Sequence, residues 1–341
     1  MPKRIAINGL GRIGRNQLRL LLARRSELDL VAVNDPRGPR AIADLLLRSD
    51  GSSGPSTRGV RYDDDHLFLN GHAVRMLSER DPLRLPWREL GVDIVIEATA
   101  SVAGADDART HLTAGAKKVI TTVPTPDDDG TIMLGVNEHT YDPARHHVIS
   151  SASCTTNCLA PVAKVFHEAF GIDSGLMTTI RAESSDLQVQ DAPHADPRSV
   201  MGKEAKGGKI TPRSGGAASA IGRVLPELDD GRLDSYTLQV PAISGSITHL
   251  TVTASRPVTA DEVRTAYETA AEGPLKGILR CADDEIAVAG TVIDPHSSIL
   301  DAGLIRVIGS QVKISAWYDD EWGYSHRLTE LTEYVAERLS A

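Results

Sequence analysis

Residues 4–35 read RIAINGLGRIGRNQLRLLLARRSELDLVAVND, and this stretch decides the fold. The apolar run at residues 4–8 predicts a buried strand, and the apolar side chains of residues 12–25 recur at helical spacing. Residues 28–34 predict a second buried strand. A strand, a helix and a strand in this order indicate parallel strands joined by a right-handed crossover.

Three glycines, Gly9, Gly11 and Gly14, form a GxGxxG motif between the first strand and the first helix. In this motif the first glycine permits a tight turn, the second lets the backbone approach a pyrophosphate, and the third lets helix and strand pack closely. Asp35 ends the second strand, where an acid binds the ribose of a dinucleotide. The context predicts a dinucleotide site, and a glycine turn without a ligand is the alternative.

Asp35 also predicts which nicotinamide cofactor is bound. An acid at this position favours NAD, because it repels the additional phosphate of NADP. Arg37 and Arg40 lie nearby in the sequence and weaken this preference. NADP is therefore the less favoured cofactor.

The first and second halves of the chain differ in pattern. The first half continues the alternation of strands (92–99, 118–123, 147–150) and helices (40–47, 103–114), interrupted by an antiparallel insertion with a turn at Asn70–Gly71. The second half has longer strands and predicts an α+β domain with an antiparallel sheet. Its expected parts are helix 154–170, strands 175–184, 234–241, 246–255 and 311–319, helices 261–271 and 325–339, and a long loop at 188–216.

Two domains follow from this division. Residues 1–153 are expected to form the nucleotide-binding domain, with a C-terminal helix at 321–341 packing back on it. Residues 154–320 are expected to form the catalytic domain. The fold class is thus α/β, a dinucleotide-binding domain followed by an α+β domain.

Composition narrows the class of protein. The 341 residues carry a formal net charge of −9, with 41% hydrophobic and 24% charged residues. An acidic surface argues against nucleic acid and membrane partners. The N-terminus has no apolar stretch after its basic start, so we expect a cytoplasmic protein without a signal peptide. No cluster of metal-ligating residues stands out in the sequence.

Residues 150–161 read SSASCTTNCLAP and place a cysteine where a strand ends and a helix begins. The positive end of a helix dipole lowers the pKa of a thiol, and the thiolate is the nucleophile. Cys154 is therefore the candidate nucleophile. Cys158 lies one helical turn further and is interpreted as a core thiol.

The chain resembles the phosphorylating glyceraldehyde-3-phosphate dehydrogenases in this cysteine segment, in INGLGRIGR and VAVNDP, and in SAWYDDEWGYSHR near the C-terminus. The resemblance implies a Rossmann NAD-binding domain, a catalytic domain and a homotetramer. It also implies that the cysteine attacks an aldehyde, that hydride passes to NAD, and that phosphate cleaves the resulting thioester. The cofactor-binding residues it implies are Asn8, Gly9, Gly11, Arg12, Ile13, Gly14, Asn34, Asp35, Thr99, Thr122, Asp320 and Tyr324.

The segment LMTTIRAESSD departs from the family, which has its catalytic histidine at the position of Arg181. Arginine stays charged and cannot serve as a general base. It can still stabilise the Cys154 thiolate or an oxyanion by its charge. Loss of the base would cost roughly 10²–10⁴ in rate.

The substrate positions implied by the resemblance are altered as well. Ser184 and Asp186 stand where the family has threonines, and Gln239 stands where it has a phosphate-binding arginine. An acid gained and an arginine lost argue against a substrate phosphate here. The pocket that the resemblance implies for inorganic phosphate keeps Ser153 and Thr155. Arg213 is new, and an anion site restored by this arginine is the alternative to a lost phosphate site. His194, in the long loop, is interpreted as part of the loop's shape, with a substitute base as the alternative.

Asp320 stands where the family has an asparagine that holds the nicotinamide amide. A carboxylate accepts a hydrogen bond from that amide but donates none. Because Arg181 and Asp320 both map beside Cys154, we expect them to pair or to act together. The pair is either a compensation in a decayed site or a functional device with Asp320 as a new base, and we favour the functional interpretation.

The sequence therefore predicts an NAD-dependent aldehyde oxidoreductase that forms a thiohemiacetal or thioester on Cys154. Its expected substrate is a small aldehyde or acyl compound of specialised metabolism. One alternative is a non-redox cysteine enzyme (a transferase, hydrolase or cyclase) that keeps NAD as structure. A second is a catalytically weak NAD-binding paralogue, and a third is the glycolytic role of the family that the chain resembles.

Overall fold

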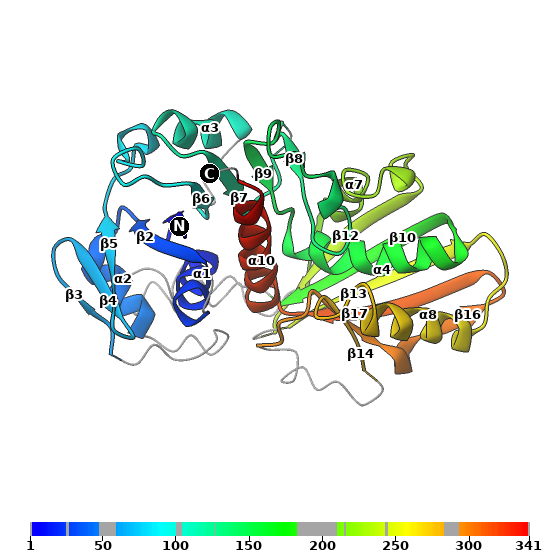
Figure 1. Ribbon diagram of the computed structural model, residues 1–341. Helices are drawn as coiled ribbons and strands as arrows, with labels where there is room; N and C mark the ends of the chain where they lie inside the picture. Colours follow the sequence, from blue (N-terminus) through cyan, green and yellow to red (C-terminus); the bar gives the residue numbers. More distant parts are fainter. Residues whose placement is uncertain are drawn as a thin grey trace. The chain divides into compact units, whose positions relative to one another are not determined.

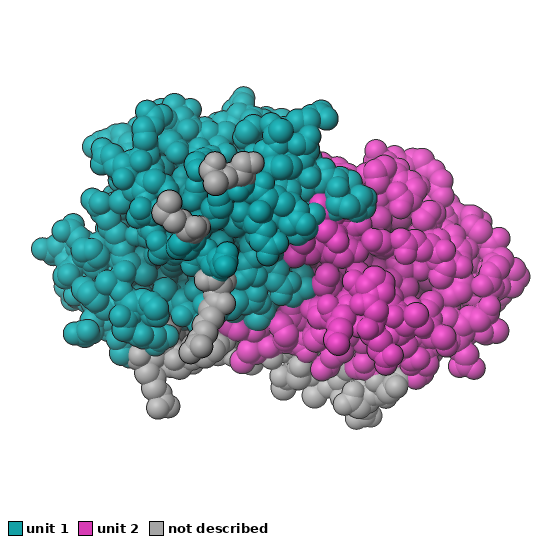
Figure 2. Space-filling view, viewed as in Figure 1, with its two compact units in different colours: residues 1–132, 139–152, 325–341 teal, residues 133–138, 153–324 magenta. Residues whose placement is uncertain are grey.

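A computed structural model describes most of the chain and divides it into two compact units, coloured separately in Figure 2. Unit 1 comprises residues 1–132, 139–152 and 325–341, and unit 2 comprises residues 133–138 and 153–324. The residues described are 2–24, 27–47, 59–99, 104–125, 127–182, 210–214, 216–242, 245–282 and 293–339.

Unit 1 is built on a nine-stranded sheet with the order β3-β4-β5-β2-β1-β6-β7-β9-β8. The strands from β5 to β9 in this order are parallel, and every residue of β6 and β7 is buried, as parallel strands covered on both faces should be. The predicted dinucleotide-binding fold is thus confirmed. The strands are β1 (Lys3–Asn8), β2 (Leu28–Asn34), β3 (Arg61–Tyr62), β4 (His66–Leu69), β5 (His72–Leu77), β6 (Ile94–Glu97), β7 (Lys118–Thr121), β8 (Gly130–Thr131) and β9 (Val148–Ser150).

The helices of unit 1 are α1 (Arg12–Ala23), α2 (Gly38–Leu47), α3 (Ala105–Thr113) and most of α10 (Trp322–Arg338). The Gln17 amide joins α1 to α10, because it donates to the Ser325 carbonyl at 2.6 Å and accepts from Thr329 Oγ1 at 3.0 Å. Within the described ranges, no helix is long and apolar enough to span a bilayer.

The predicted antiparallel insertion is confirmed in the described part of residues 59–77. Strands β3, β4 and β5 pair antiparallel. Asn70 has φ 50° and Gly71 has φ 86°, which is the left-handed backbone that a tight hairpin turn requires.

Unit 2 is built on an eight-stranded sheet with the order β11-β12-β10-β13-β17-β15-β14, in which β16 also pairs with β17. The sheet is mixed and not purely antiparallel as expected, because β10–β12 and β14–β15 are parallel pairs. A long connection between β10 and β12 includes α7 and permits the crossover that parallel pairing needs. The strands are β10 (Ile172–Ala182), β11 (Thr211–Ser214), β12 (Leu233–Val240), β13 (Ser246–Ala254), β14 (Leu279–Ala282), β15 (Ser298–Asp301), β16 (Arg306–Ile308) and β17 (Gln311–Tyr318).

The described residues of unit 2 include the α-helices α4 (Cys154–Phe170), α7 (Ala217–Ile221) and α8 (Ala260–Glu272). Helices α4 and α8 lie side by side over the sheet (Figure 1). Helix α4 has the bounds that the sequence predicts. It begins at the cysteine because Ser153 caps it, its Oγ accepting from Thr156 N at 3.0 Å.

The loop predicted at residues 188–216 is wrong for its last part, where Thr211–Ser214 form strand β11. Pro212 and the flanking glycines suggested a loop. Strand β11 is the edge of the sheet, and an edge strand tolerates proline because one side of it needs no donor. Residues 183–209 lie outside the described residues.

Candidate active site

The glycine motif of unit 1 has the geometry that a bound dinucleotide requires. Gly9 has φ 92°, and a Cβ there would lie 2.7 Å from Thr99 Cγ2. A Cβ at Gly14 would lie 1.9 Å from the Gly9 carbonyl oxygen, so strand and helix can pack only with glycine. A Cβ at Gly11 would meet nothing within 4 Å, so the backbone there faces open space.

The N-terminus of α1 fits the pyrophosphate of NAD. Gly11 is its N-cap, and no side chain caps the helix or places an acid in its first turn. The N–H groups of the first turn and the helix dipole therefore remain suited to an anion. Arg12 and Ile13 occupy this first turn and are half-buried.

Asp35 is fixed at the end of β2 by its neighbours. It accepts hydrogen bonds from Leu10 N at 2.8 Å and from Nε and an NH2 group of Arg37, both at 2.9 Å. Burial raises the pKa of Asp35, but the hydrogen bonds from Arg37 and Leu10 outweigh it and lower the pKa below its usual value. Arg37 is therefore paired with Asp35, and the carboxylate stays charged.

Further expected cofactor residues lie at the carboxyl ends of adjacent parallel strands. Asn34 ends β2, Asn8 ends β1, and the two are paired in register. Asn34 Nδ2 donates to Asn8 Oδ1 at 2.7 Å. Thr99 and Thr122 follow β6 and β7 on the same edge, where open α/β sheets bind their ligands.

The cysteine of unit 2 is the first residue of α4. The chain turns just before it at Ala152, whose φ of 58° is rare for a residue with a side chain. The Ser153 carbonyl accepts from Asn157 Nδ2 at 3.0 Å and fixes the first turn of the helix. Cys154 is partly exposed in this position.

One row of the unit 2 sheet carries the residues that surround this cysteine. Gln239, Arg181, Ser246 and Tyr318 are paired in register across β12, β10, β13 and β17, so their side chains share one face. Tyr318 Oη lies 3.0 Å from Thr155 Oγ1, which shows that this face is turned toward the start of α4.

Arg181 and Asp320 form an ion pair, with 2.8 Å between an Arg181 NH2 group and Asp320 Oδ2. The two side chains retain 33% and 20% of their exposed surface, so the pair is accessible from the site. The bond uses one of the five N–H donors of the guanidinium. The pair leaves Arg181 with further donors that a substrate oxygen can accept from.

The charges of Arg181 and Asp320 act on the Cys154 thiol, but they do not lower its pKa as expected. Burial raises the pKa of Cys154, Arg181 lowers it and Asp320 raises it, and the result lies above the ordinary value. The expectation of a lowered pKa is therefore wrong for the protein without substrate. Desolvation outweighs the attraction of a guanidinium whose charge Asp320 already compensates.

Arg213 and Gln239 also meet on this sheet. Arg213 Nε donates to Gln239 Oε1 at 3.2 Å, across the antiparallel pair β11–β12. A cation on the neighbouring strand thus lies beside the neutral amide at position 239. Three further candidates, Ser184, Asp186 and His194, lie outside the described residues.

Cys158 is a core thiol, as predicted. It is buried, its Sγ lies 3.9 Å from the Ala316 carbonyl oxygen, and burial raises its pKa to about 12. Ser246 was not predicted as a site residue. It lies between Arg181 and Tyr318 in register, and its buried Oγ has no hydrogen-bond partner among the described residues. The position of Ser246 beside Arg181 and Tyr318 follows only from the register of the strands.

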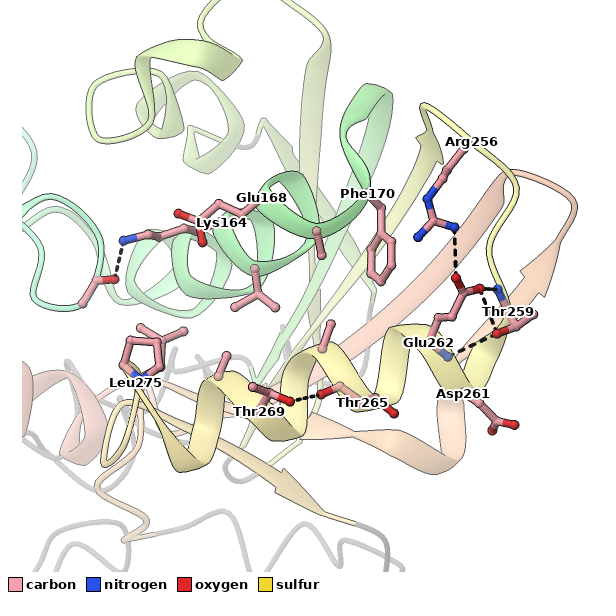
Figure 3. A pocket seen from close by; sticks show the side chains of 16 residues that line it. Lys164, Glu168, Phe170, Arg256, Thr259, Asp261, Glu262, Thr265, Thr269 and Leu275 are labelled. Atoms are coloured by element: carbon pink, nitrogen blue, oxygen red, sulfur yellow. Dashed lines mark hydrogen bonds and ion pairs between the residues drawn. The ribbon is translucent and has the colours of Figure 1, made fainter.

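A pocket of about 920 Å³ lies between α4 and α8 (Figure 3), and Cys154 is not among the residues that line it. It is lined by the C-terminal half of α4, with Lys164 and Phe170, and not by the first turn. Two of its charged side chains have partners within the protein: Lys164 Nζ donates to the Gly135 carbonyl, and Glu262 accepts from Arg256, each at 3.0 Å.

The fold and these two sites define the class as a dinucleotide-binding protein with a partly exposed cysteine at a helix N-terminus. Residues 3–105 match the model of the glyceraldehyde 3-phosphate dehydrogenase NAD binding domain, and residues 153–320 match that of the C-terminal domain of the same family. The chain therefore belongs to the glyceraldehyde 3-phosphate dehydrogenase family, an NAD oxidoreductase family, and the prediction of NAD as cofactor is confirmed.

Similar proteins span the whole chain. It is 50% identical to glyceraldehyde-3-phosphate dehydrogenase 2 of Streptomyces arenae, over 99% of this chain and 100% of that protein. It is 49% identical to glyceraldehyde-3-phosphate dehydrogenase 1 of Streptomyces avermitilis, with the same coverage. Glyceraldehyde-3-phosphate dehydrogenase of Mycobacterium leprae is 46% identical, again over 99% of this chain and 100% of that protein.

Proposed function

We propose that this protein is an NAD-dependent aldehyde oxidoreductase that forms a thiohemiacetal and then a thioester on Cys154. The observation that carries the proposal is the ion pair of Arg181 with Asp320, which interacts electrostatically with the cysteine. A base and a permanent cation beside a thiol suit a carbonyl substrate. NAD accepts a hydride when it is bound.

Three residues of the chain carry out the other steps of the proposed reaction. Cys154 Sγ attacks the aldehyde carbon and forms a carbon–sulfur bond, while the thiol proton passes to the carbonyl oxygen to complete the thiohemiacetal. Arg181 stabilises the charge that develops on this oxygen. Asp320 accepts the hydroxyl proton as the carbon is oxidised to the thioester. The acyl group then leaves to water or to another acceptor, and the thiol is restored.

The substrate we propose is a small aldehyde without a phosphate group at the Gln239 position. Arg213 supports an anionic group of other chemistry, such as a carboxylate, because its guanidinium lies on the exposed edge strand β11 and contacts only the neutral amide of Gln239 among the hydrogen bonds described for it. Specialised metabolism is the proposed setting. We further propose a cytoplasmic homotetramer without nucleic acid or membrane partners.

A second candidate function follows from the state of Asp320. Its Oδ2 is held by Arg181, in the position where the resemblance implies an asparagine that contacts the nicotinamide. This favours a non-redox cysteine enzyme, in which Cys154 carries an acyl group and NAD is retained as structure. A catalytically weak NAD-binding protein would have no covalent chemistry at all.

Two measurements on the purified protein separate these functions. A panel of carboxylated and uncharged aldehydes with NAD should give NADH, observed by its absorbance, and an acyl adduct on Cys154, observed by mass spectrometry. The adduct without NADH would support the non-redox enzyme. Neither NADH nor an adduct with any aldehyde or activated acyl compound would contradict the proposal.

A further inference from the structure

A buried polar network adjoins the glycine turn of unit 1, through the hydrogen bonds of Glu97 with Asn8 and Thr99. Glu97 ends β6 and is 2% exposed, and His111 of α3 is 1% exposed. Trp87, fully buried, completes the network. Glu97 is paired in register with Asn8, at the edge where the cofactor residues gather.

The hydrogen bonds determine where the protons of this network are. Trp87 Nε1 donates to His111 Nδ1 at 2.9 Å, and an indole nitrogen can only donate. His111 Nδ1 is therefore an acceptor, so the ring is neutral and carries its proton on Nε2. That proton points to Glu97 Oε2, 2.9 Å from Nε2.

Glu97 receives donors on both carboxylate oxygens. Oε2 also accepts from Asn8 Nδ2 at 2.6 Å, while Oε1 accepts from Thr99 N at 2.7 Å and from Thr99 Oγ1. Burial raises the pKa of Glu97, but the interactions of its carboxylate with His111, Thr99 and Asn8 outweigh the burial and lower the pKa.

The network fixes the residues around the glycine turn. The Asn8 carbonyl accepts from Ala98 N at 2.8 Å, and Gly9 N donates to the Asn34 carbonyl at 2.8 Å. Thr99 is the side chain that approaches Gly9 most closely. Any shift of the Glu97 carboxylate would therefore move both sides of the loop that faces the pyrophosphate.

We propose that the Glu97 carboxylate is a positioning group for NAD, because it holds Asn8 and Thr99 in the arrangement that receives the nucleotide. His111 fixes the carboxylate in turn, and Trp87 fixes the tautomer of His111. The inference concerns nucleotide affinity alone and does not depend on the chemistry at Cys154.

The test is the dissociation constant of NAD for the full chain, measured by titration calorimetry without substrate. Glu97→Gln keeps the shape of the side chain but turns one acceptor oxygen into a donor that faces other donors. We expect it to weaken NAD binding by about tenfold or more. Unchanged affinity in the folded variant would overturn the proposal.

Asp93→Asn is the matched control. Asp93 precedes the opposite end of β6 and accepts from Arg4 N at 2.9 Å and Lys117 Nζ at 2.8 Å. Its loss should change stability but leave the NAD dissociation constant within about twofold. An equal loss of affinity in both variants would show a general effect on the sheet and would also overturn the proposal.

Trp87→Phe provides the test if Glu97→Gln does not fold. Phenylalanine fills most of the same space but lacks the indole N–H, so His111 Nδ1 loses its donor and the ring is free to change tautomer. The expected loss of NAD affinity is about threefold or more. Native affinity in this variant would contradict the proposal. Because NAD binding is measured directly, failure of the aldehyde chemistry would leave the outcome unaffected.

Discussion

The nucleotide edge of unit 1, which carries the glycine turn, Asn8 and Asn34, and the charged row of unit 2, which carries the pairs Arg181–Asp320 and Arg213–Gln239, are built in different ways. The nucleotide edge depends on backbone geometry: glycines at positions where a Cβ would clash, and polar residues bonded to one another in the core. The charged row depends on side chains that are partly exposed and paired across strands. A backbone cradle tolerates little change, whereas a row of side chains can acquire new chemistry without disturbing the sheet that carries it.

The strongest test of this contrast is removal of the nucleophile. Cys154→Ser should lower turnover by roughly 10⁴-fold or more and abolish the acyl adduct, because a serine hydroxyl is a much weaker acid and nucleophile than a thiol. NADH formation and mass spectrometry measure the two effects. NAD affinity should stay native, and Cys281→Ser, a control at another partly exposed thiol, should keep its activity. Persisting turnover would remove Cys154 from the mechanism.

The ion pair should behave as a unit. Arg181→Gln and Asp320→Asn should each lower turnover by roughly 10²-fold, because the oxyanion loses its cation or the hydroxyl its base. The double variant should be scarcely slower than either single variant, which steady-state kinetics in a double-mutant cycle would reveal.

Asp301→Asn provides the control for this cycle. Asp301 accepts from Trp317 Nε1 at 3.2 Å on the same sheet, and we place it outside the reaction. Fully multiplicative effects of the two ion-pair substitutions would mean that Arg181 and Asp320 act separately.

In unit 1, removal of the Asp35 charge should alter the selectivity between NAD and NADP more than it alters folding. Asp35→Ala removes the carboxylate that Arg37 holds, and the freed guanidinium can then face the additional phosphate of NADP. The preference for NAD over NADP should fall about tenfold, measured by calorimetric titration of both nucleotides. An unchanged ratio would show that the pair does not contact the ribose.

A smaller effect concerns pH. The pKa of Cys154 lies above its ordinary value, so the thiol form prevails at neutral pH and alkylation by iodoacetamide should accelerate as pH rises. Arg181→Gln removes the attraction that favours the thiolate, which should raise the pKa further and slow alkylation at neutral pH by about threefold. A faster reaction in that variant would contradict the sign of this interaction.

The sequence predicted the nucleotide edge more fully than the charged row. Gly9, Gly11 and Gly14 lie within six consecutive residues, and their spacing alone indicates the geometry of the turn. Helix α4 was predictable to the residue because Ser153 is its cap. These features depend on local chain geometry, which a short stretch of sequence encodes.

The remaining features depend on which strands are neighbours. The parallel pairing of β10 with β12 places Arg181 beside Gln239, and β11 brings Arg213 to the same amide. An alternating apolar pattern in the sequence predicts a strand, but it does not indicate which strand lies beside it. The raised pKa of Cys154 arises from burial, which its position at a helix start does not reveal. Glu97 was overlooked because its role depends on partners distant in sequence.

The central claim is that Arg181 has a role of its own and does not mark a decayed site. The measurement that tests it most directly is the steady-state rate of Arg181→His with the aldehydes that the native protein oxidises with NAD. We predict that this rate falls by roughly 10²-fold or more, because a neutral imidazole cannot replace the charge that the site uses. A faster oxidation of the same aldehydes by the histidine variant would contradict the account.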